Sequence, residues 1–180
     1  MRKQLIHQGT LAVAFAVVMA ACFNEPNYSD TPEIQLAGPP SRITLEAGIR
    51  VGESKRDSVI TTIRYQDGTG DIGEDPRDTA RIRKVFGKET WGNYEVRAFQ
   101  FVDGKYSLLP SSDNGKVYFP GPRRLQKGAI EGTIDFSQVF PYQRPFKLVP
   151  VKFQIRIRDR ALNVSNVIET DTIVVPLNGR

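Results

Sequence analysis

The strictest pattern in this chain is an alternation of apolar and polar side chains from Val151 to Arg158. Successive side chains of a β-strand point to opposite faces of its sheet, so a period of two predicts a strand with one buried and one wet face. The chain must therefore build a sheet that covers a hydrophobic core. The apolar positions are Val151, Phe153, Ile155 and Ile157, and the polar positions are Lys152, Gln154, Arg156 and Arg158.

Shorter runs of this kind follow Ser41, separated by clusters of Gly, Pro, Asn and Asp, and no helical period of 3.6 residues is sustained. Asp103-Gly104 favours a tight hairpin turn, and Arg81–Phe86 fits either a strand or a single helical turn. We predict an all-β fold, an antiparallel β-sandwich of about seven to nine strands. The other expected strands are Glu33–Leu36, Arg42–Ala47, Asp57–Tyr65, Tyr94–Val102, Lys105–Leu109, Lys116–Phe119, Ala129–Phe136 and Val167–Val175.

The N-terminal residues have the three parts of a secretory signal. Met1-Arg2-Lys3 is basic, Leu11–Val18 is an apolar run too short to span a bilayer, and Met19-Ala20-Ala21-Cys22 ends in small residues before a cysteine. This end resembles the lipobox of bacterial lipoproteins, with Met19 where leucine is usual. The resemblance implies cleavage before Cys22, acylation of that cysteine with a fatty acid such as palmitate, and a membrane anchor. The alternative is an ordinary secretory signal with a chance cysteine.

These features divide the chain into a signal peptide (1–21), an acylated cysteine with a flexible tether (22–40) and one sandwich domain (41–180). The segment after Cys22 is rich in Pro, Asn, Ser and acidic residues, and fully stretched it would span about 60 Å. Phe23 stands where an aspartate often marks retention in an inner membrane. We therefore expect the anchor to lie in the outer membrane of a Gram-negative bacterium.

Cleavage of the signal would remove most catalytic and metal-binding chemistry. Residues 1–21 contain the only histidine, His7, and Cys22 is the only cysteine, so the mature chain has no Ser-His-Asp or Cys-His pair and no zinc site built on His or Cys. The remaining net charge of about +3 is too small to indicate nucleic-acid binding. The oxygen ligands that remain suit hard cations such as Ca²⁺.

A local sequence supports the sandwich. Asp159-Arg160-Ala161-Leu162-Asn163-Val164-Ser165 follows the alternating strand and resembles the Asp-x-Ala-Gly-Asn-x-Ser turn between the last two strands of many bacterial immunoglobulin-like domains. Leu162 replaces the usual glycine of that turn. The resemblance implies an Ig-like β-sandwich and no particular activity.

The loop after Asp57–Tyr65 is a candidate calcium site. Asp67-Gly68-Thr69-Gly70-Asp71 supplies oxygen ligands at alternate positions, and Asp78 falls at the twelfth position counted from Asp67. Ile72 stands where an EF-hand needs glycine, so an EF-hand is rejected. In Ig-like topology the loop that begins with Asp159 lies at the same end, where Asp67, Asp71, Asp159 and Asn163 would converge. The alternative is a solvated turn.

Two aromatic residues outside the expected strands are candidates for binding a glycan. Trp91 and Tyr142 would serve if their flat faces are exposed on loops. The alternative is that the aromatic residues build the core, Phe99, Phe101, Tyr118 and Phe136 among them, and that the proline-bounded segment Phe140–Phe146 crosses between sheets.

The function we expect is that of a lipid-anchored cell-envelope protein that binds or assembles without catalysis. Its partners would be the membrane, through the N-terminal lipid, and an envelope protein or glycan. A carbohydrate-binding module, stabilised by calcium, is the second hypothesis, and a calcium-assisted hydrolase that uses the paired carboxylates is the third.

Overall fold

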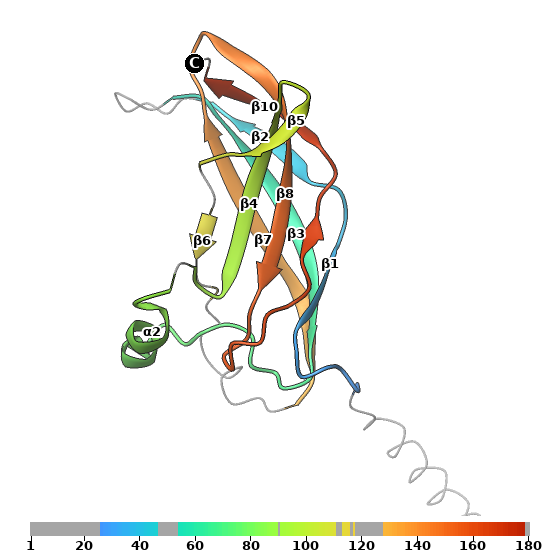
Figure 1. Cartoon of the computed structure of the whole chain (residues 1–180), viewed down its shortest axis with the longest axis vertical. Helices are drawn as coiled ribbons and strands as arrows, with labels where there is room; N and C mark the ends of the chain where they lie inside the picture. Colours follow the sequence, from blue (N-terminus) through green and yellow to red (C-terminus); the bar gives the residue numbers. More distant parts are fainter. Residues whose placement is uncertain are drawn as a thin grey trace, which may run out of the picture.

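The protein folds as an all-β sandwich of two antiparallel sheets (Figure 1). The computed structural model describes residues 26–46, 54–89, 91–110, 113–115, 117 and 128–178. These residues form a four-stranded sheet and a six-stranded sheet. The lipobox and Cys22 lie outside the described residues.

In the four-stranded sheet, the long strand β3 (Arg56–Asp67) is central. Strand β7 (Ile130–Pro141) pairs with one edge of β3 along its whole length. Strands β1 (Glu33–Leu36) and β2 (Ser41–Leu45) follow one another along the other edge, separated by a segment that contains two prolines. Because proline has no N–H to donate, the ladder is interrupted between them.

In the six-stranded sheet, β8 (Phe146–Ile157) pairs with β4 (Tyr94–Val102) on one side. The short strands β9 (Ile168–Glu169) and β10 (Ile173–Asn178) lie along the other side of β8. Strands β5 (Lys105–Leu108) and β6 (Asp113–Gly115) lie along the outer edge of β4. In both sheets, two short strands that follow one another along the same neighbouring strand take the place of one long strand. The predicted all-β sandwich of about seven to nine strands is confirmed.

The core lies between the sheets and follows the predicted alternation. Val151, Phe153, Ile155 and Ile157 of β8 expose between 0% and 1% of their surface. They meet the alternate side chains of β3, with Phe136 and Phe140 of β7 filling the space between the sheets. The inward residues of β3 are Val59, Thr61, Ile63 and Tyr65.

The strand pairing is that of an Ig-like sandwich, in which strands A, B and E form one sheet and C, F and G the other. In this protein the sheet that corresponds to A, B and E consists of β3, β7 and the two short strands β1 and β2, which share one position. The sheet that corresponds to C, F and G contains β4, β8 and the two short strands β9 and β10, which also share one position. In this arrangement the connections after β3 and β8 lie at the same end. An isolated bridge between Ile72 and Asp159 joins them there.

Four local features differ from the sequence expectations or resolve them. The segment Arg81–Phe86, which fits either a strand or a helical turn by sequence, belongs to the helix α2 (Thr79–Phe86). The last expected strand is split at Thr170, whose backbone N–H and side-chain hydroxyl both bond to Phe153. Strand β6 was not expected, and most of the predicted strand Lys116–Phe119 lies outside the described residues. Strand β1 belongs to the sandwich, although it lies within the residues 22–40 expected to form the tether.

Candidate functional site

Three aspartates meet at the end of the sandwich where β3 and β8 finish. Asp67 is the last residue of β3, Asp71 lies in the loop that follows, and Asp159 comes two residues after the end of β8. One carboxylate oxygen from each lies within 4.8 Å of those of the other two. Oxygen atoms bound to one Ca²⁺ lie at most about 5 Å apart, so this spacing fits a hard cation. The predicted convergence of Asp67, Asp71 and Asp159 is therefore found in the structure.

Burial distinguishes this cluster from a solvated turn. Asp67 and Asp159 each expose 0% of their surface, and Asp71 is half-buried. Asp67 Oδ2 accepts hydrogen bonds from Asp71 N at 2.9 Å and from Thr69 Oγ1 at 3.1 Å. The other oxygen, Asp67 Oδ1, is buried and has no hydrogen-bond partner. A buried carboxylate oxygen without a donor is costly unless a cation approaches it.

Asp159 is held by the turn that resembles the bacterial Ig-like motif. Asn163 donates from its backbone N to Asp159 Oδ1 and from its side-chain Nδ2 to Oδ2, each at 2.8 Å. Leu162 has φ 73°, so the turn keeps the left-handed conformation that glycine normally occupies. The motif thus orients the Asp159 carboxylate. Asn163 contributes to the cluster by donating hydrogen bonds to that carboxylate.

The electrostatics of the cluster favour a bound cation. Burial raises the pKa of Asp67 above its ordinary value, and the negative charge of Asp71 raises it further. The pKa of Asp159 is also raised, mainly by burial. Among the described residues no lysine or arginine forms an ion pair with the three carboxylates, and the nearby Arg81 and Arg160 face Glu74 at 3.2 and 3.9 Å. Within the described part of the chain, the three carboxylates therefore share one site without a basic side chain paired to them.

Glycines allow the loop to close around the cluster. A Cβ on Gly68 would lie 2.5 Å from Tyr28 O, and one on Gly70, whose φ is 71°, would lie 2.3 Å from Gly128 O. Gly68 N also donates to Ser29 O at 2.7 Å. The Asp67–Asp71 loop is thus packed between two other segments of the backbone.

Two predicted ligands have different roles. The Thr69 hydroxyl lies 3.1 Å from Asp67 Oδ2 and 2.6 Å from Asp71 Oδ1, so it links two members of the cluster. Asp78 does not join the cluster. It caps α2, accepting a hydrogen bond from Arg81 N at 3.1 Å, because a carboxylate just before a helix satisfies one of its free N–H groups. The twelve-residue spacing from Asp67 therefore has no meaning for metal binding.

Comparison with known proteins gave no match: no family model, no curated protein sequence and no solved structure is significantly similar to this chain.

Trp91 is covered rather than exposed as a platform. The guanidinium groups of Arg158 and Arg156 lie 4.3 and 4.5 Å from its ring centroid. Arg158 itself exposes only 6% of its surface and donates to Trp91 O and Gly92 O. The indole therefore stabilises a buried arginine, and the basic side chains of the alternating run, Lys152, Arg156 and Arg158, each form an ion pair with a glutamate.

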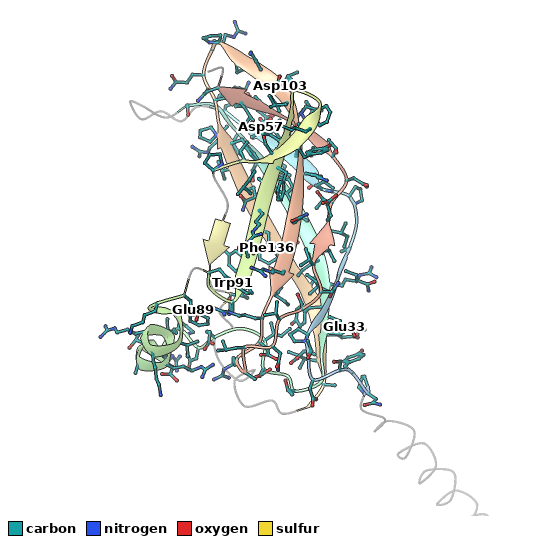
Figure 2. All side chains as sticks on the ribbon, in the orientation of Figure 1. Glu33, Asp57, Glu89, Trp91, Asp103 and Phe136 are labelled. Atoms are coloured by element: carbon teal, nitrogen blue, oxygen red, sulfur yellow. The ribbon has the colours of Figure 1, made fainter. Side chains whose placement is uncertain are left out.

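Tyr142 lies at the opposite end of the sandwich, near Asp57 (Figure 2). It exposes 9% of its surface, its ring packs edge-on against Phe146, and its hydroxyl lies 3.4 Å from Asp57 Oδ1. Burial, followed by the charge of Asp57, raises its pKa. Trp91 and Tyr142 thus lie at different ends and share no surface.

A surface that the sequence did not reveal covers the outer face of the six-stranded sheet. Phe101 and Tyr106 are directly opposite in the β4–β5 pair, with ring centroids 5.1 Å apart. The predicted core role of Phe101 is wrong, because Val96 and Ala98 are the inward residues of β4. We call this surface the apolar face; its most exposed members are Phe101 at 40%, Tyr106 at 36%, Leu108 at 53%, Leu148 at 65% and Val174 at 43%.

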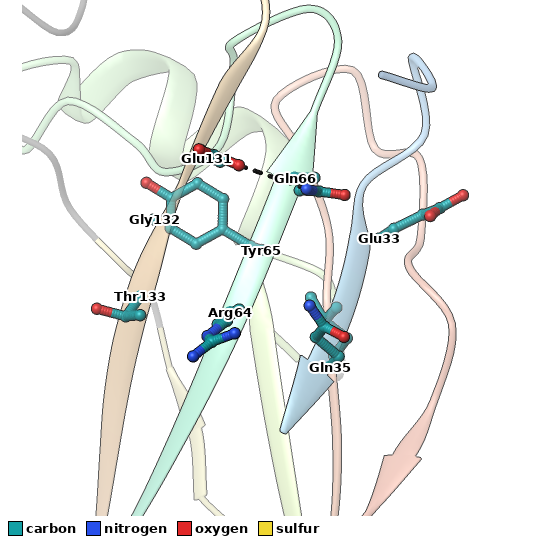
Figure 3. A pocket seen from close by; sticks show the side chains of 9 residues that line it. Glu33, Gln35, Arg64, Tyr65, Gln66, Glu131, Gly132 and Thr133 are labelled. Carbon is teal, nitrogen blue, oxygen red and sulfur yellow. Dashed lines mark hydrogen bonds between the residues drawn. The ribbon is translucent and has the colours of Figure 1, made fainter. Parts of the chain in front are cut away.

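A polar hollow of about 580 Å³ lies on the four-stranded sheet (Figure 3). It is centred where Gly132, which has no side chain, stands opposite Tyr65. Gln66 Nε2 and Glu131 Oε2 are 3.4 Å apart at its edge. Guanidinium, amide, carboxylate and hydroxyl groups thus border one open depression. The polar side chains that line it are Glu33, Gln35, Arg64, Gln66, Glu131 and Thr133.

None of the described residues forms a helix of the length and apolar character needed to cross a membrane.

Proposed function

We propose that this protein is a lipid-anchored, non-catalytic binding or assembly protein of the cell envelope. Cys22 would carry the lipid, placing the sandwich at the outer membrane of a Gram-negative bacterium. The observation that carries the binding role is the apolar face. Soluble proteins rarely expose a contiguous apolar patch larger than a few hundred Å². Patches above that size mark sites of interaction with another molecule.

The partner on this face is an envelope protein. Leu148 and Val174 add aliphatic surface to the aromatic rings of Phe101 and Tyr106. At one border Lys152 is already paired with Glu169 at 2.7 Å, so few charges would lose their partners on contact. Aromatic anchors surrounded by aliphatic residues are typical of the centre of protein interfaces.

Site-specific cross-linking in cells tests this role. A photoreactive amino acid at Leu148 should trap one discrete partner, and Phe101→Ser in the same chain should abolish that product. The control position is Val139, which is 50% exposed on the other sheet. A uniform background at both positions, or a product unaffected by Phe101→Ser, would contradict the proposal.

The Asp67, Asp71 and Asp159 cluster binds Ca²⁺ as a structural ion in this proposal. Ca²⁺ prefers several oxygen ligands in flexible geometry, which two loops and a strand end can supply. Because Asp67 and Asp159 have no exposed surface, a substrate has no access to them, which supports a structural role over that of a calcium-assisted hydrolase.

Titration calorimetry with Ca²⁺ and melting with and without chelator test the ion. A ligand at one hundred times its Kd adds about 2.7 kcal/mol to the free energy of unfolding, so saturating Ca²⁺ should raise the melting temperature clearly. Asp71→Asn should abolish that increase. Asp135→Asn, which changes an exposed carboxylate bonded to Thr62, should not. No heat and identical melting in calcium and chelator would reject the ion.

A glycan-binding role has one observation in its favour, the polar hollow of Figure 3. Its amide, guanidinium and carboxylate groups could bond to sugar hydroxyls. Affinity electrophoresis over a glycan panel tests this. If a glycan slows the migration of the wild type, Arg64→Ala should restore the normal mobility. Arg97→Ala, which changes an exposed arginine on the other sheet, should not. Unchanged mobility on every glycan would argue against it.

A further inference from the structure

The chain enters the sandwich at the end that carries the aspartate cluster. Ser29 O accepts the hydrogen bond from Gly68 N at 2.7 Å, and the Tyr28 hydroxyl donates to Glu131 Oε2 at 2.6 Å. Pro32 is fully buried. Residues from Tyr28 onward are therefore held against the sandwich instead of belonging to a tether that continues to residue 40.

Only a short length of chain separates this attachment from Cys22. Residues 22–28 reach at most about 20 Å when fully extended, compared with about 60 Å for the whole expected tether. This step rests on the lipid anchor proposed above. With the lipid on Cys22, the cluster end stays close to the membrane. The length of β3, about 40 Å for twelve residues, carries the opposite end away from it.

Helix α2 lies at this same end (Figure 1). The segment from Arg77 to Lys88 contains one carboxylate, Asp78, which is half-buried and caps the helix. Arg81 is paired with Glu74. In the part of the chain that the structure describes, the remaining basic residues of this segment are exposed and form no ion pair. They are Arg77, Arg83, Lys84 and Lys88, and we call them the basic α2 surface.

We infer that the basic α2 surface docks onto anionic lipid headgroups of the membrane that holds the anchor. Each lysine or arginine close to an anionic surface strengthens adsorption about fivefold. Four such residues would bind weakly on their own. The short connection to the lipid raises their effective concentration at the membrane, so that weak adsorption is enough to orient the domain.

The docked orientation leaves the apolar face accessible. The exposed residues of that face lie near the Val102 end of β4, on β5, on the half of β8 nearest Phe146 and on β10. These segments lie away from the end where β8 reaches Ile157 and the cluster. The membrane would therefore contact α2 and the neighbouring loops, while the apolar face projects toward a partner.

The test uses the mature acylated chain in vesicles of phosphatidylcholine, with or without phosphatidylglycerol. Acylation consumes the thiol of Cys22, the only cysteine, so a dye on Ala80→Cys reports on α2 alone. The reference position is Lys105→Cys, beside the β4–β5 turn at the other end. Quenching by a headgroup-labelled lipid measures the proximity of each dye to the membrane.

Phosphatidylglycerol should increase quenching at position 80 severalfold and leave position 105 unchanged. Arg83→Glu combined with Lys84→Glu should remove the increase, as should high salt, which shortens the Debye length to about 3 Å at 1 M. The matched control is Lys105→Glu combined with Lys147→Glu, which reverses two exposed charges at the far end.

The two proposals fail in different ways. A chain that does not float with either type of vesicle would overturn the lipid anchor, and the docking with it. A chain that floats, but whose dye at position 80 is insensitive to phosphatidylglycerol and to the Arg83 and Lys84 reversals, would overturn the docking alone. Stronger quenching at position 105 than at position 80 would also overturn the docking.

Discussion

Ile72 and Asp159 pair across an antiparallel bridge that joins the loop after β3 to the loop after β8. The bridge connects the ends of strands from different sheets, and Arg160 N strengthens the junction by donating to Asp71 O at 3.1 Å. Ile72 is also part of the core. Its burial brings Asp71 next to Asp159, so packing and the candidate metal site depend on the same contact.

The metal-free protein should lose stability as the pH rises through the titration of its buried aspartates. Burial raises the pKa of Asp67 and of Asp159 in the folded state. A carboxyl whose pKa rises on folding binds protons more readily when folded, so its contribution to stability is fully present below the unfolded pKa. That contribution decreases as the pH rises through the folded pKa.

Melting of the wild type and of Asp67→Asn in chelator, from about pH 4 to pH 7, checks this. The variant should gain stability relative to the wild type as the pH rises, because it has no charge to bury. A difference in melting temperature between the two proteins that stays constant with pH would contradict the raised pKa of Asp67. With saturating Ca²⁺ the wild type should instead gain stability toward neutral pH, because the ligands must be deprotonated to bind.

Leu162→Gly should stabilise the protein by about 1 kcal/mol. Leu162 has φ 73°, a conformation that costs an L-residue roughly 1–2 kcal/mol and glycine very little, although glycine also increases the entropy of the unfolded chain. Denaturant unfolding measures the difference. Ala161→Gly is the neighbouring control and should be neutral or destabilising. A loss of stability in Leu162→Gly would show that the backbone of Leu162 is not strained.

Gly68→Ala should destabilise the protein by about 1–3 kcal/mol, since its methyl group would collide with backbone oxygens of Tyr28 and Ser29. The collision would also displace the segment that leads to Cys22. Gly38→Ala is the matched control, because nothing lies within 4 Å of a Cβ at that position. Equal melting temperatures for the two variants would show that the contact with Ser29 is not close.

Arg158→Met should cost about 2–4 kcal/mol, because it leaves the carbonyls of Trp91 and Gly92 without their donor. Trp91 is the only tryptophan, so its fluorescence should change when the guanidinium over its ring is removed. Arg83→Met, on the exposed side of α2, should stay within about 0.5 kcal/mol of the wild type. An unchanged fluorescence in Arg158→Met would contradict the stacking.

The elements with a strict alternation were predictable from the sequence. In β8 and β3 one face is apolar and the other polar, so the period alone identifies the buried side. Strand β4 was misread because both of its faces carry apolar residues, and only its register against β8 shows that Val96 points inward and Phe101 outward. Local patterns contain no such register.

The candidate site was predictable where topology constrains it. Two connections placed at one end of an Ig-like sandwich bring Asp67 and Asp159 together. Spacing along the loop was a poor guide, because Asp78 had an alternative use as a helix cap and α2 was not distinguishable from a strand. The pairing of Arg158 with distant backbone carbonyls had no local signal either.

The sequence by itself determined the β-sandwich and the strands that form its core, and it gives two predictions: a lipid at Cys22 and a mature chain that has lost its only histidine, His7. Alternation and composition are local properties that can be read without knowing the neighbours of a residue. Tertiary structure alone decided that Asp67 Oδ1 is buried without a donor, that Phe101 faces outward and that Tyr28 is held against the sandwich. Each of these depends on contacts between residues far apart in the chain, which are set only when the two sheets pack together.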